Sequence, residues 1–308
     1  MKRKIFLCEQ IHQQAYNLLK KNFKIVTDWD KLDQVEGLIV RNFRVDRKLI
    51  DCCQSLKVVA VHGTGYDHLD LSYLKSRGVT VFRVPGENAQ SVAEFTVALM
   101  LNLSRNIYLA DRCLQQGNEI ELGTKQLEGT ELFEKTVGLI GWGQIARKTA
   151  FILQMGFRMN VIVYSPSLTE KQALNDHIEK CETLKELFTR ADIVSVHCSL
   201  NDQTRKLIHD DILRYAKSSC LLVNTARGKI IDEKALYKAL KNGVIKGAAC
   251  DVFSDEPISK SHPLLSLPQF LATPHIAATT DEALYRVGMK VVYGLIDYFE
   301  GKDMENRL

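Results

Sequence analysis

Short apolar segments alternate with amphipathic segments along almost the whole chain, and this alternation constrains the fold more than any other feature. In the first eighty residues, runs typical of buried strands are separated by runs with helical spacing of apolar residues. Strands that alternate with helices predict a parallel sheet with helices on both faces. The expected strands are 5–8, 24–26, 37–40, 57–61 and 79–82, and the expected helices are 11–21, 47–53 and 71–77.

A second series of the same kind begins at residue 136. A long helical pattern over 89–113 and a polar segment over 115–135 precede it. We therefore predict an α/β chain with two doubly wound parallel-sheet domains, joined by the helix near 89–113. The expected strands of the second series are 136–140, 160–164, 192–196, 219–224, 247–252 and 270–273, and a last helix is expected over 281–300.

The composition excludes several classes of protein. A chain of 308 residues with 45% hydrophobic and 25% charged residues is long enough for two ordinary globular domains. The small net charge of +4, without a run of lysines and arginines, gives no indication of a nucleic-acid partner. The apolar stretch after Met1 is too short for a signal peptide, and we expect no membrane partner. The eight scattered cysteines, without a CxxC pair, predict a cytoplasmic protein without a metal site.

The segment 136–146 is a strand that runs into the pattern Gly141-x-Gly143-x-x-Ala146 and then into a helix. Gly141 permits a tight turn, Gly143 lets the backbone approach a pyrophosphate, and Ala146 keeps the helix close to the sheet. The free N–H groups at the start of the helix favour an anion. A glycine turn without a ligand is the alternative, but the strand before it and the helix after it favour a dinucleotide site. The cofactor-binding residues on this turn would be Gly141, Gly143, Gln144 and Ile145.

The residues after the next strand leave the choice of cofactor open. An acidic residue that binds the ribose of NAD is usual at this point, but the chain has Ser165-Pro166-Ser167. No carboxylate repels a 2′-phosphate here, and no arginine attracts one. Ser165 and Ser167 can hydrogen-bond NAD or NADP, and Lys171 lies close enough in sequence to help bind a phosphate. Our hypothesis is relaxed specificity or a preference for NADPH.

Three residues suited to hydride chemistry follow three successive strands. Arg227 follows the strand at 219–224, Glu256 follows the next strand, and His275 follows the last. Arginine binds a carboxylate with two hydrogen bonds, histidine gives or takes a hydroxyl proton, and glutamate orients the histidine. A surface ion pair, a turn cap and a core histidine are the separate alternatives. The joint placement of the arginine, the glutamate and the histidine at strand ends predicts an oxidoreductase acting on a small anionic 2-hydroxy or 2-keto acid.

The chain resembles the D-isomer-specific 2-hydroxyacid dehydrogenase family. The resemblance implies that Arg227, Glu256 and His275 are the catalytic residues, and that the backbone amides near Thr64 and Gly65 bind the substrate carboxylate opposite Arg227. The segments that carry it are 61–67, 88–94, 141–146, 224–231, 247–257 and 273–278. The cofactor contacts expected beyond the glycine turn are Ser165, His197, Thr225 and Asp251, the last of these at the nicotinamide carboxamide.

The resemblance also implies a domain organisation. A Rossmann cofactor domain over 98–282 would be inserted into a flavodoxin-like substrate domain made of 1–97 and 283–308. Members are usually homodimers built on the long helix after residue 88 and its extension. The chain resembles the phosphoglycerate dehydrogenase and hydroxypyruvate reductase members of the family, and we expect the short form without a regulatory domain.

The substrate stays open between 3-phosphoglycerate, hydroxypyruvate and glyoxylate. Arg41, in the segment 39–44, resembles the arginine of the phosphate-binding loop in phosphoglycerate dehydrogenases, and Arg44 lies close by. Val61, however, stands where those enzymes often carry a second arginine. A non-catalytic, dinucleotide-sensing protein of the corepressor type is the alternative function. It would need the glycine turn but not the three catalytic residues, all of which are present.

Overall fold

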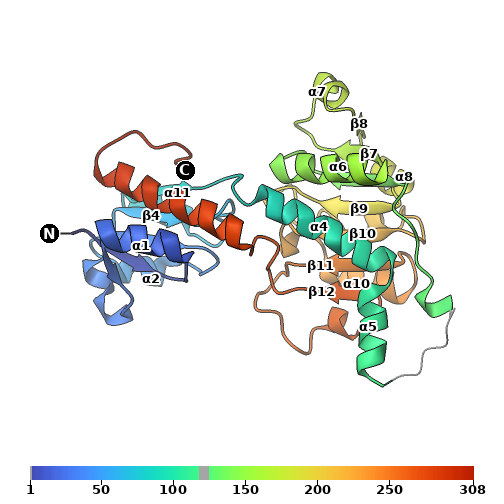
Figure 1. Ribbon diagram of the computed structural model, residues 1–308, viewed down its shortest axis with the longest axis horizontal. Helices are drawn as coiled ribbons and strands as arrows, with labels where there is room; N and C mark the ends of the chain where they lie inside the picture. The colour runs from blue at the N-terminus through green and yellow to red at the C-terminus, as the bar shows by residue number, and fades with distance from the viewer. Residues whose placement is uncertain (1, 118–124) are drawn as a thin grey trace. The chain divides into compact units, whose positions relative to one another are not determined.

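The computed structural model describes residues 2–117 and 125–308, which form two compact units (Figure 1). The first unit is Met1–Asn88 with Ala278–Leu308, and the second is Ala89–Ala277. The helix that begins at Ala89 belongs to the second unit, and its residues Val97, Leu99 and Met100 pack in the core of that unit. The compact units divide the chain at 88/89 and 277/278, and the domain bounds implied by the resemblance are 97/98 and 282/283. The last helix, with its N-cap Thr280, belongs to the first unit.

The first unit is built on a five-stranded parallel sheet in the order β2-β1-β3-β4-β5. This is the strand order of flavodoxin-like sheets, as predicted. Its strands are β1 (Lys4–Leu7), β2 (Lys24–Val26), β3 (Gly37–Val40), β4 (Val58–Val61) and β5 (Thr80–Arg83). Its helices are α1 (Gln13–Asn22), α2 (Arg47–Cys52), α3 (Leu71–Ser76) and α11 (Asp281–Phe299), with the 3-10 helix η1 (Trp29–Gln34).

Helices cover both faces of this sheet, so its central strands are apolar throughout. On one face, Val58 and Ala60 pack with Leu19 of α1 and Val291 of α11. On the other face, apolar residues of α2, α3 and η1 complete the core. The last helix returns to the first unit because its buried stripe is needed to cover the sheet.

The second unit is built on a seven-stranded parallel sheet in the order β12-β11-β10-β9-β6-β7-β8. This is the Rossmann order with one further strand at the end, so the predicted fold class is confirmed. Its strands are β6 (Thr136–Ile140), β7 (Asn160–Tyr164), β8 (Glu179–Lys180), β9 (Ile193–Val196), β10 (Leu221–Asn224), β11 (Gly247–Cys250) and β12 (Phe270–Ala272). Its helices are α4 (Ala89–Ser104), α5 (Ile107–Gln115), α6 (Gln144–Phe157), α7 (Glu170–Asn175), α8 (Leu184–Arg190), α9 (Asp210–Leu213) and α10 (Glu233–Lys241), with the 3-10 helices η2 (Lys125–Leu127), η3 (Gly228–Ile230) and η4 (Pro263–Ser266).

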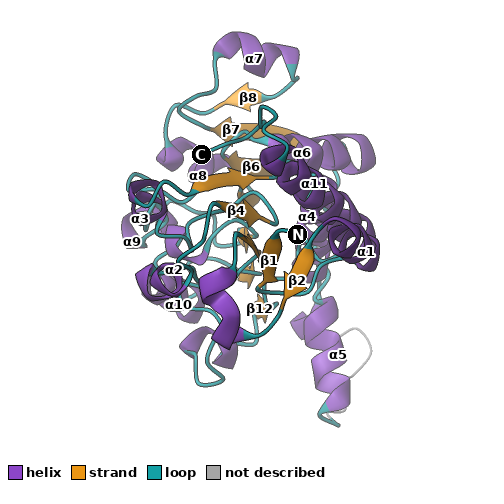
Figure 2. Cartoon of the chain, turned by 90° about the vertical axis from the view of Figure 1, so that its left-hand side faces the viewer, coloured by secondary structure: helices purple, strands orange, loops and turns teal. Residues whose placement is uncertain are grey.

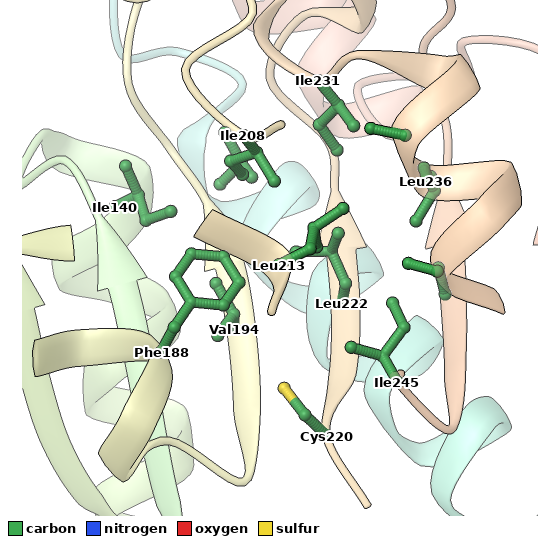
Figure 3. Packing of buried hydrophobic residues seen from close by; sticks show 14 of the residues in the cluster. Ile140, Phe188, Val194, Ile208, Leu213, Cys220, Leu222, Ile231, Leu236 and Ile245 are labelled. Carbon is green, nitrogen blue, oxygen red and sulfur yellow. The ribbon is translucent and has the colours of Figure 1, made fainter. Parts of the chain in front are cut away.

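Two apolar clusters fix the layers of the second unit. Residues of α4 and α6 pack on one face of the sheet. On the other face, Phe188 of α8, Leu213 of α9 and Leu236 of α10 surround Val194 and Leu222 of the sheet (Figure 3). Figure 2 shows β6, β7 and β8 in succession toward one edge of this sheet.

The long helix expected over 89–113 is two helices. Asn106 adopts a left-handed backbone conformation, with φ of 53°, between α4 and α5. Asparagine tolerates this conformation better than most residues. Two side-chain bonds stabilise the break, because Asn102 Oδ1 accepts from the Tyr108 N–H and Asn106 Nδ2 donates to the Glu128 carbonyl. None of the helices that the structure describes has both the length and the apolar character that crossing a bilayer requires.

Candidate active site

All residues predicted to bind the cofactor, and all three predicted catalytic residues, lie at one edge of the second sheet. Parallel strands bring their carboxyl ends to the same edge, and ligands of open α/β sheets bind there. Gly141 to Ile145 follow β6, Ser165 follows β7, His197 follows β9, Thr225 and Arg227 follow β10, Asp251 and Glu256 follow β11, and His275 follows β12.

The turn after β6 leaves open space where a pyrophosphate would lie. Gly141 has φ of 98°, and a Cβ there would lie 2.8 Å from the backbone nitrogen of Cys198. Gly143 is the N-cap residue of α6, faces open space and provides no side-chain cap, which leaves the first N–H groups of the helix available. The turn and the helix N-terminus therefore fit a dinucleotide phosphate.

The polar residues at the neighbouring strand ends are hydrogen-bonded, and Ser165 and Thr225 are also buried. Ser165 is 6% exposed, and its hydroxyl lies 3.3 Å from that of Ser167. Burial lowers the pKa of His197 to about 4, so its ring is neutral at pH 7. His197 Nε2 lies 3.0 Å from the Ser195 hydroxyl, which orients the ring. Thr225 is held by the hydroxyl of Thr96, at 2.9 Å.

Glu256 and His275 are in direct contact. His275 Nδ1 lies 2.7 Å from Glu256 Oε2, and their side chains are 30% and 34% exposed. Burial by itself would raise the pKa of Glu256. The hydrogen bond and charge of His275, the Phe253 N–H and the charge of Arg227 together hold this pKa below its ordinary value. Glu256 is therefore a carboxylate at neutral pH, and it accepts a hydrogen bond from Nδ1 of His275, which orients the ring.

Asp251 organises the loop that carries His275. This carboxylate is fully buried and accepts from the Thr273 hydroxyl at 2.6 Å and from the amides of Ile276 and Ala277 at 2.9 and 2.8 Å. The His275 N–H donates to the Asp251 carbonyl at 2.8 Å, and His275 has φ of 56°. A left-handed conformation is uncommon for histidine, and these bonds hold it. The sequence indicated a cofactor contact for Asp251 but not this organising role.

A backbone contact joins the loop of Arg227 to the loop of Glu256. A Cβ on Gly228 would lie only 1.9 Å from the carbonyl carbon of Phe253. Asn224 holds the same loop, since its Nδ2 donates to the Arg227 carbonyl at 3.0 Å. Sequence reasoning missed Gly228, because nothing in its surroundings in the chain distinguishes it from an ordinary turn glycine.

Of the four predicted substrate residues, Arg227 follows β10 of the second sheet, and the other three lie at the carboxyl edge of the first sheet. Thr64 and Gly65 follow β4, and the Thr64 carbonyl accepts from the guanidinium of Arg83 at 3.1 Å. Arg41 follows β3, and its Nη2 donates to the Thr279 hydroxyl at 2.7 Å.

Glu9 anchors the Arg41 loop and was missed by the sequence analysis. Its carboxylate accepts from the amides of Arg41, Asn42 and Phe43, at distances of 2.6 to 3.2 Å. The sequence feature that could have indicated Glu9 is its position directly after the first apolar run, 5–8.

His62 is a buried histidine at the end of β4. It is 4% exposed, and its Nε2 has no hydrogen-bond partner among the described residues. Burial and, to a smaller extent, the charge of Arg41 lower its pKa to about 4. Since an unfolded chain protonates histidine near pH 6.5, the unfolded state binds more protons than the folded state between pH 4 and 6.5. Stability is therefore lost as the pH falls through this range.

We expect His62 to contribute about 2 kcal/mol to the loss of unfolding free energy between pH 7 and pH 5. The measurement is urea denaturation at both pH values, for the wild type and for His62→Gln, which has no ionisable side chain. His197 contributes to the pH dependence of both proteins, so the difference between them isolates His62. An equal pH dependence in the two proteins would contradict the assignment.

No group of three or more potential metal ligands occurs in the part of the chain that the structure describes.

Residues 97–277 match the model of the D-isomer specific 2-hydroxyacid dehydrogenase NAD-binding domain. The chain belongs to the D-isomer specific 2-hydroxyacid dehydrogenase family. Its family domain covers the Rossmann sheet and ends just after His275.

Relatives match over nearly the whole chain. D-3-phosphoglycerate dehydrogenase of Methanocaldococcus jannaschii is 35% identical over 98% of this chain, which spans 59% of that protein's length. Glyoxylate reductase of Thermofilum pendens is 34% identical over 97% of this chain and 92% of its own length. A crystal structure of the NADPH-dependent glyoxylate/hydroxypyruvate reductase of Sinorhizobium meliloti, with NADP and malonate, has a TM-score of 0.88 at 28% identity, covering 100% of this chain and 97% of that one. These family members are reductases and dehydrogenases, and none supports the dinucleotide-sensing alternative.

Proposed function

We propose that this chain catalyses reversible hydride transfer between NAD(P) and a small 2-hydroxy or 2-keto acid. The observation that carries the proposal is the contact of 2.7 Å between His275 and Glu256, at the same sheet edge as the Gly141–Gly143 turn. A histidine held by a carboxylate is a general acid and base, and a dinucleotide turn beside it brings a redox cofactor to that group.

Each residue has a chemical task in this proposal. The bound cofactor supplies or accepts the hydride. His275 Nδ1 faces Glu256, which leaves Nε2 to give its proton to the carbonyl oxygen during reduction and to take it back during oxidation. Arg227 binds the substrate carboxylate and polarises the carbonyl. Because reduction needs a protonated His275 and oxidation a neutral one, reduction is favoured at lower pH and oxidation at higher pH.

The residues of the first unit would select the acid. The amides near Thr64 and Gly65 bind the substrate carboxylate, and Arg41 meets a distal hydroxyl or phosphate. Arg41 supports a small anionic substrate of the 3-phosphoglycerate, hydroxypyruvate or glyoxylate type. Val61, buried in β4, supplies no second positive charge for a phosphate.

The test is the initial rate of NADH and NADPH oxidation with hydroxypyruvate, glyoxylate, 3-phosphohydroxypyruvate, phenylpyruvate and 2-ketoglutarate. Turnover of one of these acids supports the proposal and names the substrate. Cofactor binding without turnover of any acid would contradict it.

Replacing Ser165 by aspartate is expected to shift cofactor preference toward NADH by about tenfold or more. A carboxylate at this buried strand end would repel the 2′-phosphate of NADPH and accept hydrogen bonds from the ribose of NADH. The measurement is the ratio of kcat/KM for the two cofactors in Ser165→Asp and in the wild type. Ser219→Ala, at an exposed serine before the amino end of β10, serves as the control. An unchanged ratio in Ser165→Asp would show that Ser165 does not face the ribose.

We further propose a homodimer in the cytoplasm. None of the residues of α5 is buried in the chain, and α5 projects away from the second sheet (Figures 1 and 2). Ile107 and Leu114 of α5, and Phe151 and Met155 of α6, are exposed by 53% to 72%, as expected of an interface. The cysteines are free thiols, in keeping with a reducing compartment. Light scattering of the full chain should give twice 34.9 kDa, and the monomer mass would contradict the dimer.

A further inference from the structure

Two carboxylates bind successive amides of the loop after β11. Within the loop, the Phe253 N–H donates to Glu256 Oε1 at 2.8 Å, while Glu256 Oε2 meets His275. The next amide, that of Ser254, donates to Glu233 Oε1 at 2.7 Å. Glu233 is the first residue of α10, so a helix outside the loop fixes the residue beside Phe253.

The second oxygen of Glu233 is bound by a histidine. Glu233 Oε2 lies 3.2 Å from His262 Nε2, and each of the two side chains is only 21% exposed. His262 precedes η4, and its ring packs edge-on against the ring of Phe253, with centroids 6.0 Å apart. His262 and Glu233 therefore hold the loop at two points, the Ser254 amide and the Phe253 ring.

A stabilising role in the helix does not account for this arrangement. An acidic residue in a first turn favours the helix dipole, and a surface ion pair contributes little. The capping of α10 is carried out by Asp232, whose Oδ1 accepts from the amides of Lys234 and Ala235. Both oxygens of Glu233 are instead bound to groups outside the helix, and the contact is mostly buried.

We propose that Glu233 and His262 are positioning residues of the hydride-transfer site. They hold Ser254, and through it the loop that determines where the Glu256 carboxylate meets Nδ1 of His275. The inference rests on the proposed function. Neither residue touches the reacting atoms, but a displacement of about 1 Å at a catalytic group can lower a rate about a hundredfold.

Three variants separate the contributions that the bond of Glu233 to Ser254 and its bond to His262 make to catalysis. Glu233→Ala removes both bonds, Glu233→Gln keeps an oxygen for the Ser254 amide, and His262→Phe keeps the ring on Phe253 but loses the bond to Glu233. We expect kcat to fall at least about tenfold in Glu233→Ala and about two- to fivefold in the other two variants, with the KM for the cofactor within about twofold of wild type. Glu170→Ala is the matched control, because it removes the first-turn carboxylate of α7, away from this loop.

A second measurement distinguishes positioning from stability. A carboxylate at Nδ1 favours the protonated ring, so a loosened Glu256 favours the neutral ring. In Glu233→Ala, we expect the pH midpoint of the kcat profile and the NMR titration midpoint of the ¹³C-labelled His275 ring to move together to lower pH. His275→Asn identifies the signal among the eight histidines, and Glu170→Ala should leave both midpoints unchanged.

Unchanged kcat and midpoints in folded Glu233→Ala would overturn the inference. Lower thermal stability or kcat with unchanged midpoints would also overturn it, because the role would then be structural only. If Glu233→Ala does not fold, Glu233→Gln and His262→Phe test the inference. We expect them to change kcat and the two pH midpoints in the same direction but by less. If the wild type reduces no 2-keto acid, the proposed function fails, while the NMR titration still tests the positioning.

Discussion

Replacing His275 by asparagine is expected to lower kcat for reduction of a 2-keto acid by about two to four orders of magnitude. The variant loses the proton that the carbonyl oxygen needs as the hydride arrives. Asparagine is the suitable replacement because His275 has φ of 56°, which asparagine tolerates and alanine does not. The measurement is the initial rate of NADH or NADPH oxidation with the acid that the wild type reduces.

The controls for this variant test whether the loss lies in the chemical step. The dissociation constant of the cofactor and the thermal midpoint should stay close to those of the wild type, because the backbone bonds from Asp251 to the His275 loop are kept. Glu256→Gln should lose less activity than His275→Asn, since it removes the charge beside the ring but keeps an oxygen. Turnover of His275→Asn within about tenfold of wild type would show that another group transfers the proton.

The strands could be predicted from the sequence because both faces of each sheet are covered. A strand that is buried on both faces consists of consecutive apolar residues, and the runs at 37–40, 136–140 and 160–164 have the same bounds in the structure. The edge strand β8 was missed, since Glu179 and Lys180 are polar. The break at Asn106 was also missed, because a single left-handed residue does not interrupt the apolar periodicity around it.

The location of the site could be predicted for a related reason. Parallel strands align their carboxyl ends, so residues that follow successive strands lie at one edge, and Glu256 and His275 are in contact there. The groups that hold them could not be predicted. Glu233 has the sequence position of an ordinary first-turn acid, and its bond to Ser254 depends on how α10 packs against a loop further along the chain.

Among the contacts between residues distant in the sequence, the contact of Gly228 has the largest consequence for the geometry of the site. In the sequence Gly228 stands between Arg227 and Lys229. In the structure its Cα lies against the backbone of Phe253, which is remote in sequence. The distance between the Arg227 loop and the Glu256 loop is therefore set by the absence of a side chain.

Gly228→Ala is expected to lower kcat/KM about a hundredfold and to destabilise the fold by about 1–3 kcal/mol or more. The added Cβ would lie 1.9, 2.2 and 2.4 Å from the carbonyl carbon, the oxygen and the Cα of Phe253. These are backbone atoms, which cannot rotate away as a flexible side chain would. The two loops must therefore separate, and Arg227 moves relative to Glu256 and His275. Initial rates and urea denaturation measure the two effects.

Gly156→Ala is the matched control for this prediction. Gly156 lies inside α6, and a Cβ there would meet no atom within 4 Å. Because alanine is favoured over glycine within a helix, this variant should be more stable than wild type by about 0.5–1 kcal/mol and fully active. If Gly228→Ala were as active and as stable as Gly156→Ala, the contact with Phe253 would not set the geometry of the site. A selective loss in Gly228→Ala would instead show that Arg227, Glu256 and His275 act only when these two loops touch.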